Sequence, residues 1–191
     1  MKILKNLLLL VLALLVGAGI AVYRIADFER SDAFFHNGSW MGSKNLPLGK
    51  DPLLTTQITV FALFALPSEE AIYLFAKRDK NNEIFDSSND YTISGNIHQI
   101  SAKYWSITAY GSDLYLMPNT LNRFGFNNSN IKTDSLGNFT ISVSHQPRSG
   151  NWLPTPDHAS FNLVLRIYKG DKYFLERLDT TSLPEITLTA K

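Results

Sequence analysis

The sequence predicts a mainly β protein, a β-sandwich with one packed helix, preceded by an N-terminal transmembrane helix. Three observations predict this fold class: an uncharged apolar stretch near the N-terminus, one stretch of helical periodicity, and short strand-like runs separated by turns in the remainder of the chain. The expected organisation is a transmembrane anchor over residues 1–23, an irregular connector over residues 24–50 and a β-sandwich domain over residues 51–191.

The apolar stretch over residues 6–23 has the length of a membrane span. It contains no charged residue, and a helix of this length is roughly 27 Å long, close to the roughly 30 Å of the hydrocarbon core. Lys2 and Lys5 precede it, and basic residues favour the cytoplasmic side of a span. The prediction is a single-pass protein that contacts the membrane through residues 6–23 and has its C-terminal domain outside the cytoplasm.

A cleaved signal peptide is the alternative for the same segment. Such a peptide has a shorter apolar run, followed by small residues at the cleavage site. Gly17, Ala18, Gly19 and Ala21 are small, but the apolar run continues to Tyr23 without a clear site. We favour a retained anchor, and the sequence leaves cleavage open.

The composition argues against several classes of function. The 191 residues include no cysteine, which removes disulfides, thiolate metal sites and cysteine nucleophiles. The formal net charge of +1 becomes −1 for the exported part when Lys2 and Lys5 are left out. Nucleic-acid binding relies on a concentrated basic surface, so no nucleic-acid partner is expected.

The helix is predicted to begin at Asp51 and Pro52. Aspartate caps free amides at a helix start, and proline suits the first helical position. One apolar helical face follows, formed by Leu54, Ile58, Phe61 and Ala65. Pro67 is expected to stop the helix. Before Asp51, glycines and a proline indicate the irregular connector.

The β-rich region begins at Ala71. Strand-like runs cover residues 71–76, 91–94, 103–110, 114–117, 138–144 and 161–168. The run over 138–144 alternates apolar and polar residues, which is typical of a half-buried strand. The run over 161–168 is predicted to be central in its sheet, and residues 173–175 to pair with it across a turn at Lys169-Gly170-Asp171.

An ordered set of short motifs resembles a known family. The motifs are Gly38-Ser39-Trp40, Asp51-Pro52, Ser68-Glu69-Glu70-Ala71-Ile72-Tyr73, Tyr104-Trp105-Ser106-Ile107-Thr108, Asn119 to Arg123, Asn151-Trp152-Leu153-Pro154 and Leu165-Arg166-Ile167-Tyr168. Together they resemble the short membrane-anchored branch of a bacterial family named domain of unknown function 1214. The resemblance implies a jelly-roll-like β-sandwich at the cell envelope, with the anchor in the bacterial inner membrane and the domain in the periplasm. It implies no accepted activity.

Signals for catalysis or metal binding are weak. The four histidines are His36, His98, His145 and His158, and none stands in the short His-x-His or His-x₃-His spacing common at metal sites. No metal and no cofactor are expected. No G-x-S-x-G nucleophile elbow occurs, and no spacing selects a carboxylate pair. His145 and His158 flank a long loop and are the pair to test.

A polar and aromatic constellation is the better candidate site. The candidate ligand-binding residues are Trp105, Asn119, Asn122, Arg123, His145, Asn151, Trp152 and Arg166. Asparagine donates and accepts hydrogen bonds, arginine offers a planar fork, and tryptophan offers a stacking face. Such sets suit carbohydrate or carboxylate-bearing ligands. The alternative is structural: asparagines hold loops together, and the Trp-Leu-Pro loop plugs an end of the sandwich. In that case Arg166 pairs with Glu70 or Asp113, or extends its stem across the sheet.

Three functional hypotheses follow. The first is a membrane-anchored domain outside the cytoplasm that binds a small polar ligand or an envelope protein. The second is a hydrolase acting on small esters or sugar-derived compounds, with its site near Arg123, His145, Asn151 and Trp152. The third is a structural partner in an envelope complex, for which a contiguous exposed apolar patch is the expected sign.

Overall fold

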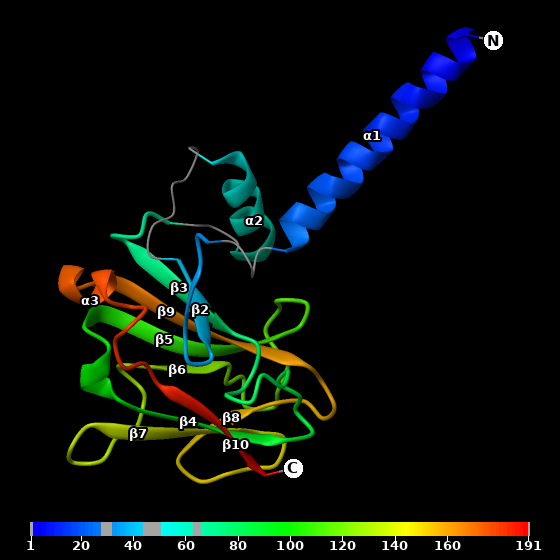
Figure 1. Cartoon of the computed structure of the whole chain (residues 1–191). Helices are drawn as coiled ribbons and strands as arrows, with labels where there is room; N and C mark the ends of the chain where they lie inside the picture. Colours follow the sequence, from blue (N-terminus) through cyan, green and yellow to red (C-terminus); the bar gives the residue numbers. More distant parts are fainter. Residues whose placement is uncertain (1, 28–31, 44–50, 63–65, 191) are drawn as a thin grey trace. The chain divides into compact units, whose positions relative to one another are not determined.

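The computed structural model describes residues 2–27, 32–43, 51–62 and 66–190. Within it the chain forms two compact units. One holds helices α1 (Lys2–Ala26) and α2 (Pro52–Ala62), and the other holds the strands, the short helix α3 (Lys172–Glu176) and the 3-10 helix η2 (Ile97–Gln99) (Figure 1). The mainly β prediction is confirmed, and the jelly-roll detail stays a prediction.

The first unit consists of the two predicted helices. α1 is long and apolar enough to cross a membrane, although a signal sequence would have the same character. α2 begins as predicted, because the carboxylate of Asp51 accepts a hydrogen bond from the Leu54 amide at 3.0 Å. Leu54 and Ile58 on its apolar face are buried. The Phe61 side chain and Ala65, also predicted on that face, lie outside the described residues, and the packing of this helix on the sandwich stays a prediction.

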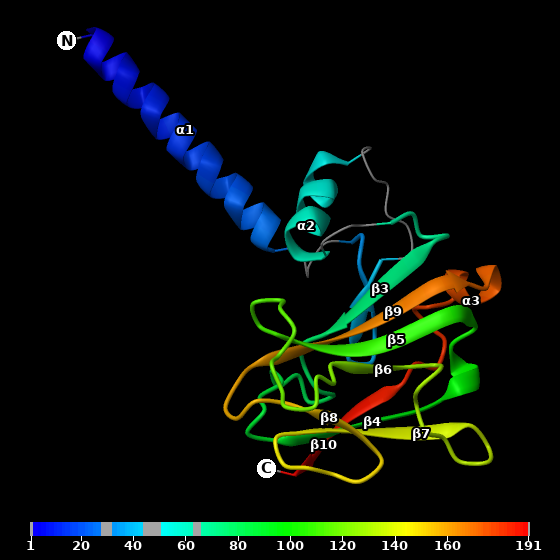
Figure 2. The ribbon, with the colours of Figure 1, turned by 180° about the vertical axis from the view of Figure 1, so that it is seen from behind.

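The larger sheet has six antiparallel strands in the order β1-β2-β3-β9-β5-β6 (Figures 1 and 2). Their bounds are β1 Phe35–Asn37, β2 Trp40–Gly42, β3 Ala71–Ala76, β9 Phe161–Gly170, β5 Ala102–Gly111 and β6 Gly125–Asn127. The central position of β9, between β3 and β5, confirms the predicted central strand.

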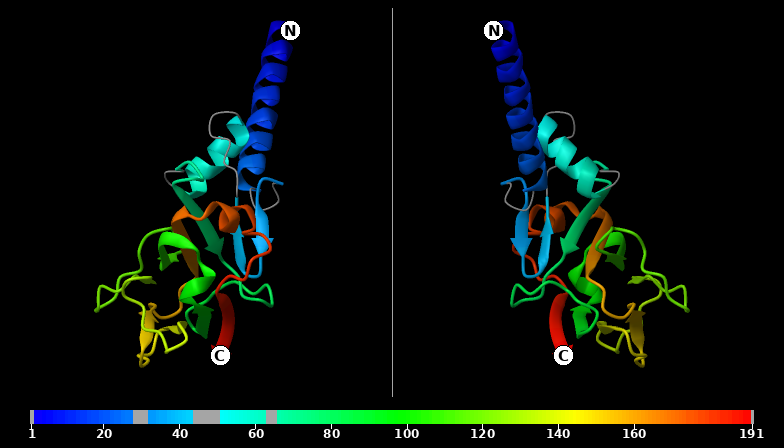
Figure 3. Two further views of the ribbon diagram at one scale, coloured as in Figure 1. Left: turned by 90° about the vertical axis from the view of Figure 1, so that its left-hand side faces the viewer. Right: turned by 90° about the vertical axis from the view of Figure 1, so that its right-hand side faces the viewer.

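The smaller sheet has four strands in the order β10-β4-β7-β8. Their bounds are β10 Glu185–Ala190, β4 Asp90–Asn96, β7 Asn138–Ser144 and β8 Asn151–Pro154. β7 and β8 run parallel, whereas the other pairs are antiparallel. The C-terminal strand β10 (red) forms one edge of this sheet, with β4 between it and β7 (Figure 3).

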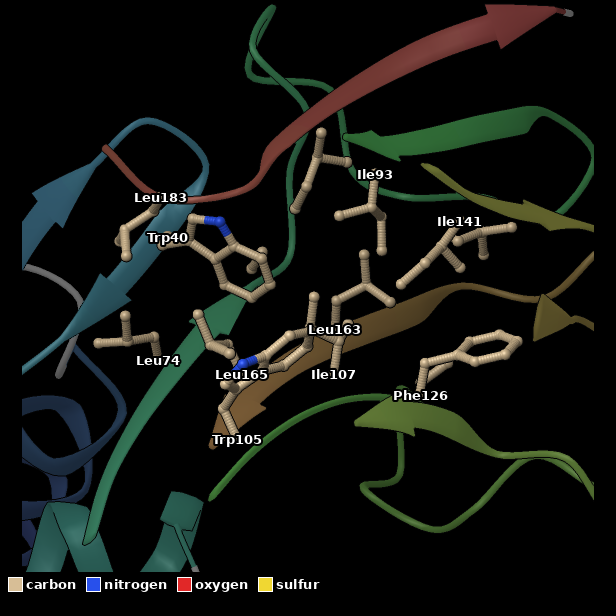
Figure 4. Close-up of a cluster of buried hydrophobic side chains, with 14 of the residues drawn as sticks. Trp40, Leu74, Ile93, Trp105, Ile107, Phe126, Ile141, Leu163, Leu165 and Leu183 are labelled. Carbon is tan, nitrogen blue, oxygen red and sulfur yellow. The ribbon is translucent and has the colours of Figure 1, made fainter. Parts of the chain in front are cut away.

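One hydrophobic core lies between the two sheets. Leu74, Ile107 and Leu165 from the larger sheet meet Ile93 and Ile141 from the smaller one, and all five are fully buried (Figure 4). This arrangement follows from the two-residue period of a strand, which directs alternate side chains to opposite faces.

The predicted connector and two short apolar runs do not have the expected structure. Residues 24–50 were predicted as an irregular connector, but Phe35–Gly42 forms the β1–β2 hairpin, and β2 pairs with β3. The Trp40 indole of this hairpin is buried in the core and donates to the Pro184 carbonyl at 2.7 Å (Figure 4). The hairpin therefore belongs to the β unit rather than to a linker.

The other two errors concern short apolar runs. Residues 173–175 form part of helix α3 instead of a strand, because the Asp171 carboxylate caps the amides of Tyr173 and Phe174. Residues 114–117 form a turn with one isolated bridge between Tyr110 and Leu116. Apolar strand-forming residues alone did not distinguish these conformations.

Candidate functional site

The outer face of the larger sheet carries a polar and aromatic row. On β5, Trp105, Ile107 and Ala109 point into the core, whereas Tyr104, Ser106, Thr108 and Tyr110 alternate with them. Opposite residues of antiparallel strands share a face. The register joins Asn127 to Ser106, Ser106 to Arg166 and Arg166 to Tyr73, which gives one row across β6, β5, β9 and β3.

A hollow of about 440 Å³ lies over β5, β6 and β9, strands that lie side by side in Figure 2. Its lining residues are Tyr104, Ser106, Thr108, Phe124, Gly125, Phe126, Asn127, Arg166 and Tyr168. All of them belong to the β unit. The hollow has the size range of small-molecule sites, and its lining combines hydroxyl, amide, aromatic and guanidinium groups.

Arg166 is held by neighbours on β5. Its Nη1 donates to Thr108 Oγ1 at 3.1 Å, and its Nη2 donates to the Tyr110 hydroxyl. The guanidinium carbon also lies 5.1 Å from the Tyr110 ring centroid and 6.0 Å from that of Tyr73, which is the geometry of cation–π contacts. These contacts fix the position of the half-buried guanidinium.

The sequence offered two roles for Arg166, and the first of them, an ion pair with Glu70 or Asp113, is wrong. Glu70 pairs with Lys169 at 3.3 Å, and the Asp113 carboxylate accepts from the Tyr115 amide at 3.0 Å. Within the part of the chain that the structure describes, no carboxylate forms an ion pair with Arg166. A guanidinium that faces a hollow without a counter-charge is suited to an anionic ligand.

The Tyr73 hydroxyl, next to Arg166, is neutral at physiological pH. Burial, together with the hydrogen bond to Tyr168, raises the pKa of Tyr73 to about 12, although the charge of Arg166 opposes the shift. The Tyr168 ring contacts those of Tyr73 and Tyr104, with centroids 6.3 Å and 5.8 Å apart. The charge of this face therefore comes from the guanidinium.

Of the predicted site residues, Arg166 lines the hollow and Trp105 does not. Trp105 is 1% exposed and stacks on Phe139 in the core, with ring centroids 5.6 Å apart. It cannot contact a ligand while the core stays packed. Its neighbour Ser106 does line the hollow.

Asn119, Asn122 and Arg123 lie in a turn before β6. The Asn119 amide nitrogen donates to the carbonyls of Met117 and Arg123, and its oxygen accepts from the amides of Leu121 and Arg123. Asn122 has a φ of 48°, a left-handed conformation that asparagine tolerates. Asn119 thus organises the turn through backbone groups, as the structural alternative expects.

Arg123 and Trp152 contact each other. Arg123 Nη1 donates to the Trp152 carbonyl at 3.1 Å, and the guanidinium carbon lies 5.8 Å from the Phe126 ring centroid. The Trp152 indole nitrogen donates to both the carbonyl and the hydroxyl oxygen of Ser144 at 3.1 Å. Neither residue lines the hollow. Arg123 nevertheless contacts the ring of Phe126, which does line it.

Asn151 and Trp152 were predicted in a loop, but they lie on strand β8. The Asn151 side chain donates to the carbonyls of Lys132 and Thr140 and accepts from the Lys132 amide, and it is 5% exposed. Asn151 therefore cross-links the segment before β7 to β8, a structural role.

The two histidines singled out as a pair are exposed and have separate partners. The Nδ1 atom of His145 lies 3.2 Å from the Thr155 carbonyl oxygen, and His158 Nε2 lies 3.5 Å from the Asp157 carboxylate. Over the described ranges, no group of three or more His, Cys, Asp or Glu side chains could hold a metal ion.

Most residues that line the hollow were not predicted from the sequence. Tyr104, Thr108, Asn127 and Tyr168 were not candidates, although Tyr104, Ser106 and Thr108 alternate with apolar residues along one predicted strand. That alternation could have identified an outer face with ligand-binding groups. It could not have indicated which strands lie next to it, because the register of β5 with β6 and β9 is a tertiary property.

Two solved structures are similar to this chain. It resembles the VPA0106 protein of Vibrio parahaemolyticus, whose crystal structure matches 74% of this chain and 36% of that one, with 27% identity and a TM-score of 0.58. An uncharacterised protein of Burkholderia cenocepacia matches 90% of this chain and 39% of that one, with 14% identity and a TM-score of 0.44. This chain therefore spans little more than a third of the length of either. Among curated proteins, none matches.

The family match covers the β unit from its third strand to its last short helix. Residues 70–172 match the family model described as a protein of unknown function (DUF1214), and this segment includes the residues that line the hollow. Because that segment is more than half of the chain, the protein belongs to the DUF1214 family.

Proposed function

We propose that this protein is a membrane-anchored domain that binds a small polar ligand outside the cytoplasm. The anchor is α1, whose apolar length suits a membrane span. The binding site is the hollow over β5, β6 and β9. The proposed location is the bacterial inner membrane, with the β unit in the periplasm.

Arg166 is the observation that carries the binding proposal. Its guanidinium lines the hollow, is held in place by Thr108 and Tyr110, and forms no ion pair with a carboxylate in the described residues. A positive group that is held by neutral neighbours favours a negatively charged ligand group. The other form of this proposal is that the domain binds an envelope protein rather than a small ligand.

Thermal unfolding of the full chain in detergent tests this proposal. A library of small polar compounds is added, and compounds that bind the folded state raise the unfolding temperature. We expect stabilising compounds to carry an anionic group, and the Arg166→Gln variant to lose their effect. Arg148→Gln is the matched control, because Arg148 pairs with Asp90 outside the hollow. If the compounds raise the unfolding temperature of both variants equally, the proposed site is wrong.

A separate experiment tests the orientation. Lys2 and Lys5 favour a cytoplasmic N-terminus, so a reporter fused after Lys191 is expected to be active only in the periplasm. Activity confined to the cytoplasm would reverse the proposed topology. Replacing both lysines by glutamate is expected to weaken the preference, because the positive charges set it. N-terminal sequencing of the membrane-bound protein distinguishes a retained α1 from a cleaved signal.

Hydrolysis of small esters or sugar-derived compounds was the alternative. None of the residues named for its expected site (Arg123, His145, Asn151 and Trp152) lines the hollow. Asn151 uses its side chain to bond backbone groups, and His145 contacts a backbone carbonyl. We therefore propose ligand binding, rather than hydrolysis, as the function.

A further inference from the structure

We infer that the ligand of the hollow is a carboxylated sugar, with its carboxylate on Arg166 and its hydroxyl groups along Ser106 and Asn127. This inference rests on the proposed function and names its ligand class. Three features of the hollow support it: its single charged side chain, its unpaired neutral polar groups and its aromatic wall.

The charge of the lining suits a monoanion. Arg166 is its charged residue, and the lining includes neither an acidic residue nor a second basic one. A guanidinium has five N–H donors, and Thr108 and Tyr110 take one each. The remaining donors form the planar fork that binds a carboxylate through two parallel hydrogen bonds.

Neutral hydrogen-bonding groups extend the row away from Arg166. The Asn127 oxygen accepts from the amides of Ser129 and Asn130, at 2.7 Å and 3.2 Å. The NH₂ group of Asn127 therefore has no protein acceptor among the described residues. The Ser106 hydroxyl has none among them either. Both line the hollow. They can bond to sugar hydroxyls, which donate and accept.

The spacing of the row fits one sugar ring. Asn127 lies opposite Ser106, and Ser106 lies opposite Arg166. Neighbouring strands are about 4.8 Å apart, so Asn127 and Arg166 are separated by about 10 Å. A carboxylate at one end and ring hydroxyls at the other therefore reach both residues at once.

The aromatic wall supplies an apolar surface for the ring. Tyr104 is 38% exposed and lies beside Tyr168, with ring centroids 5.8 Å apart. Phe124 and Phe126 also line the hollow. Exposed aromatic side chains with a polar tip suit ligands that have both C–H faces and hydroxyl edges. A simple carboxylic acid would leave these groups unused.

Calorimetric titration of the full chain in detergent tests the inference. The probes are three sugar acids (D-glucuronate, D-galacturonate and N-acetylneuraminate), with D-glucose, acetate and D-glucose 6-phosphate as comparisons. We expect at least one sugar acid to bind at least tenfold more tightly than glucose, acetate or the phosphate. Binding of acetate or the sugar phosphate as tight as that of every sugar acid would overturn the ligand class.

Variants locate the binding. We expect Arg166→Gln to weaken sugar-acid binding at least tenfold. Ser106→Ala and Asn127→Asp are each expected to weaken it at least threefold. Asn127→Asp keeps an oxygen that holds the turn, and it replaces the NH₂ donors by a negatively charged acceptor, which also repels an anionic ligand. Arg148→Gln is expected to bind like the wild type. If Arg166→Gln fails to fold, the other two variants still decide the question, because unchanged binding in both would overturn the assignment.

The outcomes separate this inference from the proposed function. If no sugar acid binds but another anionic compound does so in an Arg166-dependent manner, the sugar-acid inference is wrong and the binding function stands. If no compound stabilises the chain through Arg166, both are wrong.

Discussion

Thr108 on β5 holds Arg166 on β9: the Thr108 hydroxyl oxygen accepts a hydrogen bond from Arg166 Nη1 at 3.1 Å. The two residues are diagonal neighbours, because Arg166 lies opposite Ser106 and Thr108 lies opposite Val164. The Tyr110 hydroxyl accepts from Nη2 of the same guanidinium. Two β5 side chains thus limit the rotation of a long side chain that would otherwise lose conformational entropy on binding a ligand.

Thr108→Val tests this positioning role. We expect the free energy of unfolding to fall by about 1 kcal/mol, the contribution of one partly exposed hydrogen bond. We also expect ligand affinity to fall, because the guanidinium gains freedom. Thr92→Val is the matched control: it removes the hydrogen bond between the Thr92 and Thr189 hydroxyls on the other sheet and should leave affinity unchanged. Equal affinity losses in both variants would argue against positioning.

Asn151 is predicted to be a stability residue rather than a ligand contact. Asn151→Ala removes three hydrogen bonds from a side chain that is 5% exposed and leaves backbone groups of Lys132 and Thr140 without this partner. The expected loss is about 2–3 kcal/mol in the free energy of unfolding, measured by denaturant titration. Asn128→Ala removes one exposed bond at 3.3 Å and should cost less than about 1 kcal/mol.

The sequence correctly predicted those strands whose local pattern of apolar residues agrees with their packing in the fold. Alternation identified the strand that became β7, and the apolar run at 161–168 identified β9. It did not identify β8, because Asn151-Trp152-Leu153-Pro154 lies among prolines that are typical of loops. β8 is a strand because it pairs in parallel with β7, and its own composition does not indicate that pairing.

The same reason explains why the candidate site was identified only in part. Arg166 stood out as a charged residue in an apolar strand, and it does line the hollow. Trp105 was a candidate because tryptophan offers a stacking face, but the two-residue period places it in the core. Tyr104, Asn127 and Tyr168 acquire their significance from the strand register, which composition and spacing do not specify.

Asp134 is predicted to make the turn before β7 sensitive to acid. Hydrogen bonds from the Asn138 side chain and amide, and from the Leu136 amide, lower the pKa of the Asp134 carboxyl. The carboxylate therefore stabilises the folded state fully above the ordinary pKa of this group. The contribution disappears as the pH falls through the lower folded-state pKa.

Unfolding temperatures of the wild type and Asp134→Asn measure this dependence. We expect the wild type to be the more stable at about pH 6 and the difference to narrow toward about pH 2.5, because the variant does not titrate at this position. A difference that is constant with pH would show that Asp134 does not act through its charge.

Gly125 is predicted to be required for the wall of the hollow. A Cβ atom at this position would lie 2.3 Å from the Ile107 carbonyl oxygen and 2.9 Å from Thr108 Oγ1. Gly125→Ala therefore displaces β6 from β5, at an expected cost of about 1–3 kcal/mol in the free energy of unfolding. Ligand binding should fall as well, because Asn127 follows on β6. Gly19→Ala in α1 introduces no contact within 4 Å and should leave binding unchanged.

Trp40 is predicted to fasten the β1–β2 hairpin to the β unit. Its indole nitrogen donates to the Pro184 carbonyl at 2.7 Å, and the side chain is 1% exposed. Trp40→Phe keeps an aromatic ring but leaves that carbonyl without its donor, so the free energy of unfolding should fall by about 1–3 kcal/mol. Trp152→Phe, at a partly exposed indole that donates to Ser144, is the control and should cost less. If Trp40→Phe unfolded like the wild type while hydrogen exchange in β1 and β2 stayed slow, the hairpin would be held by β3 pairing alone.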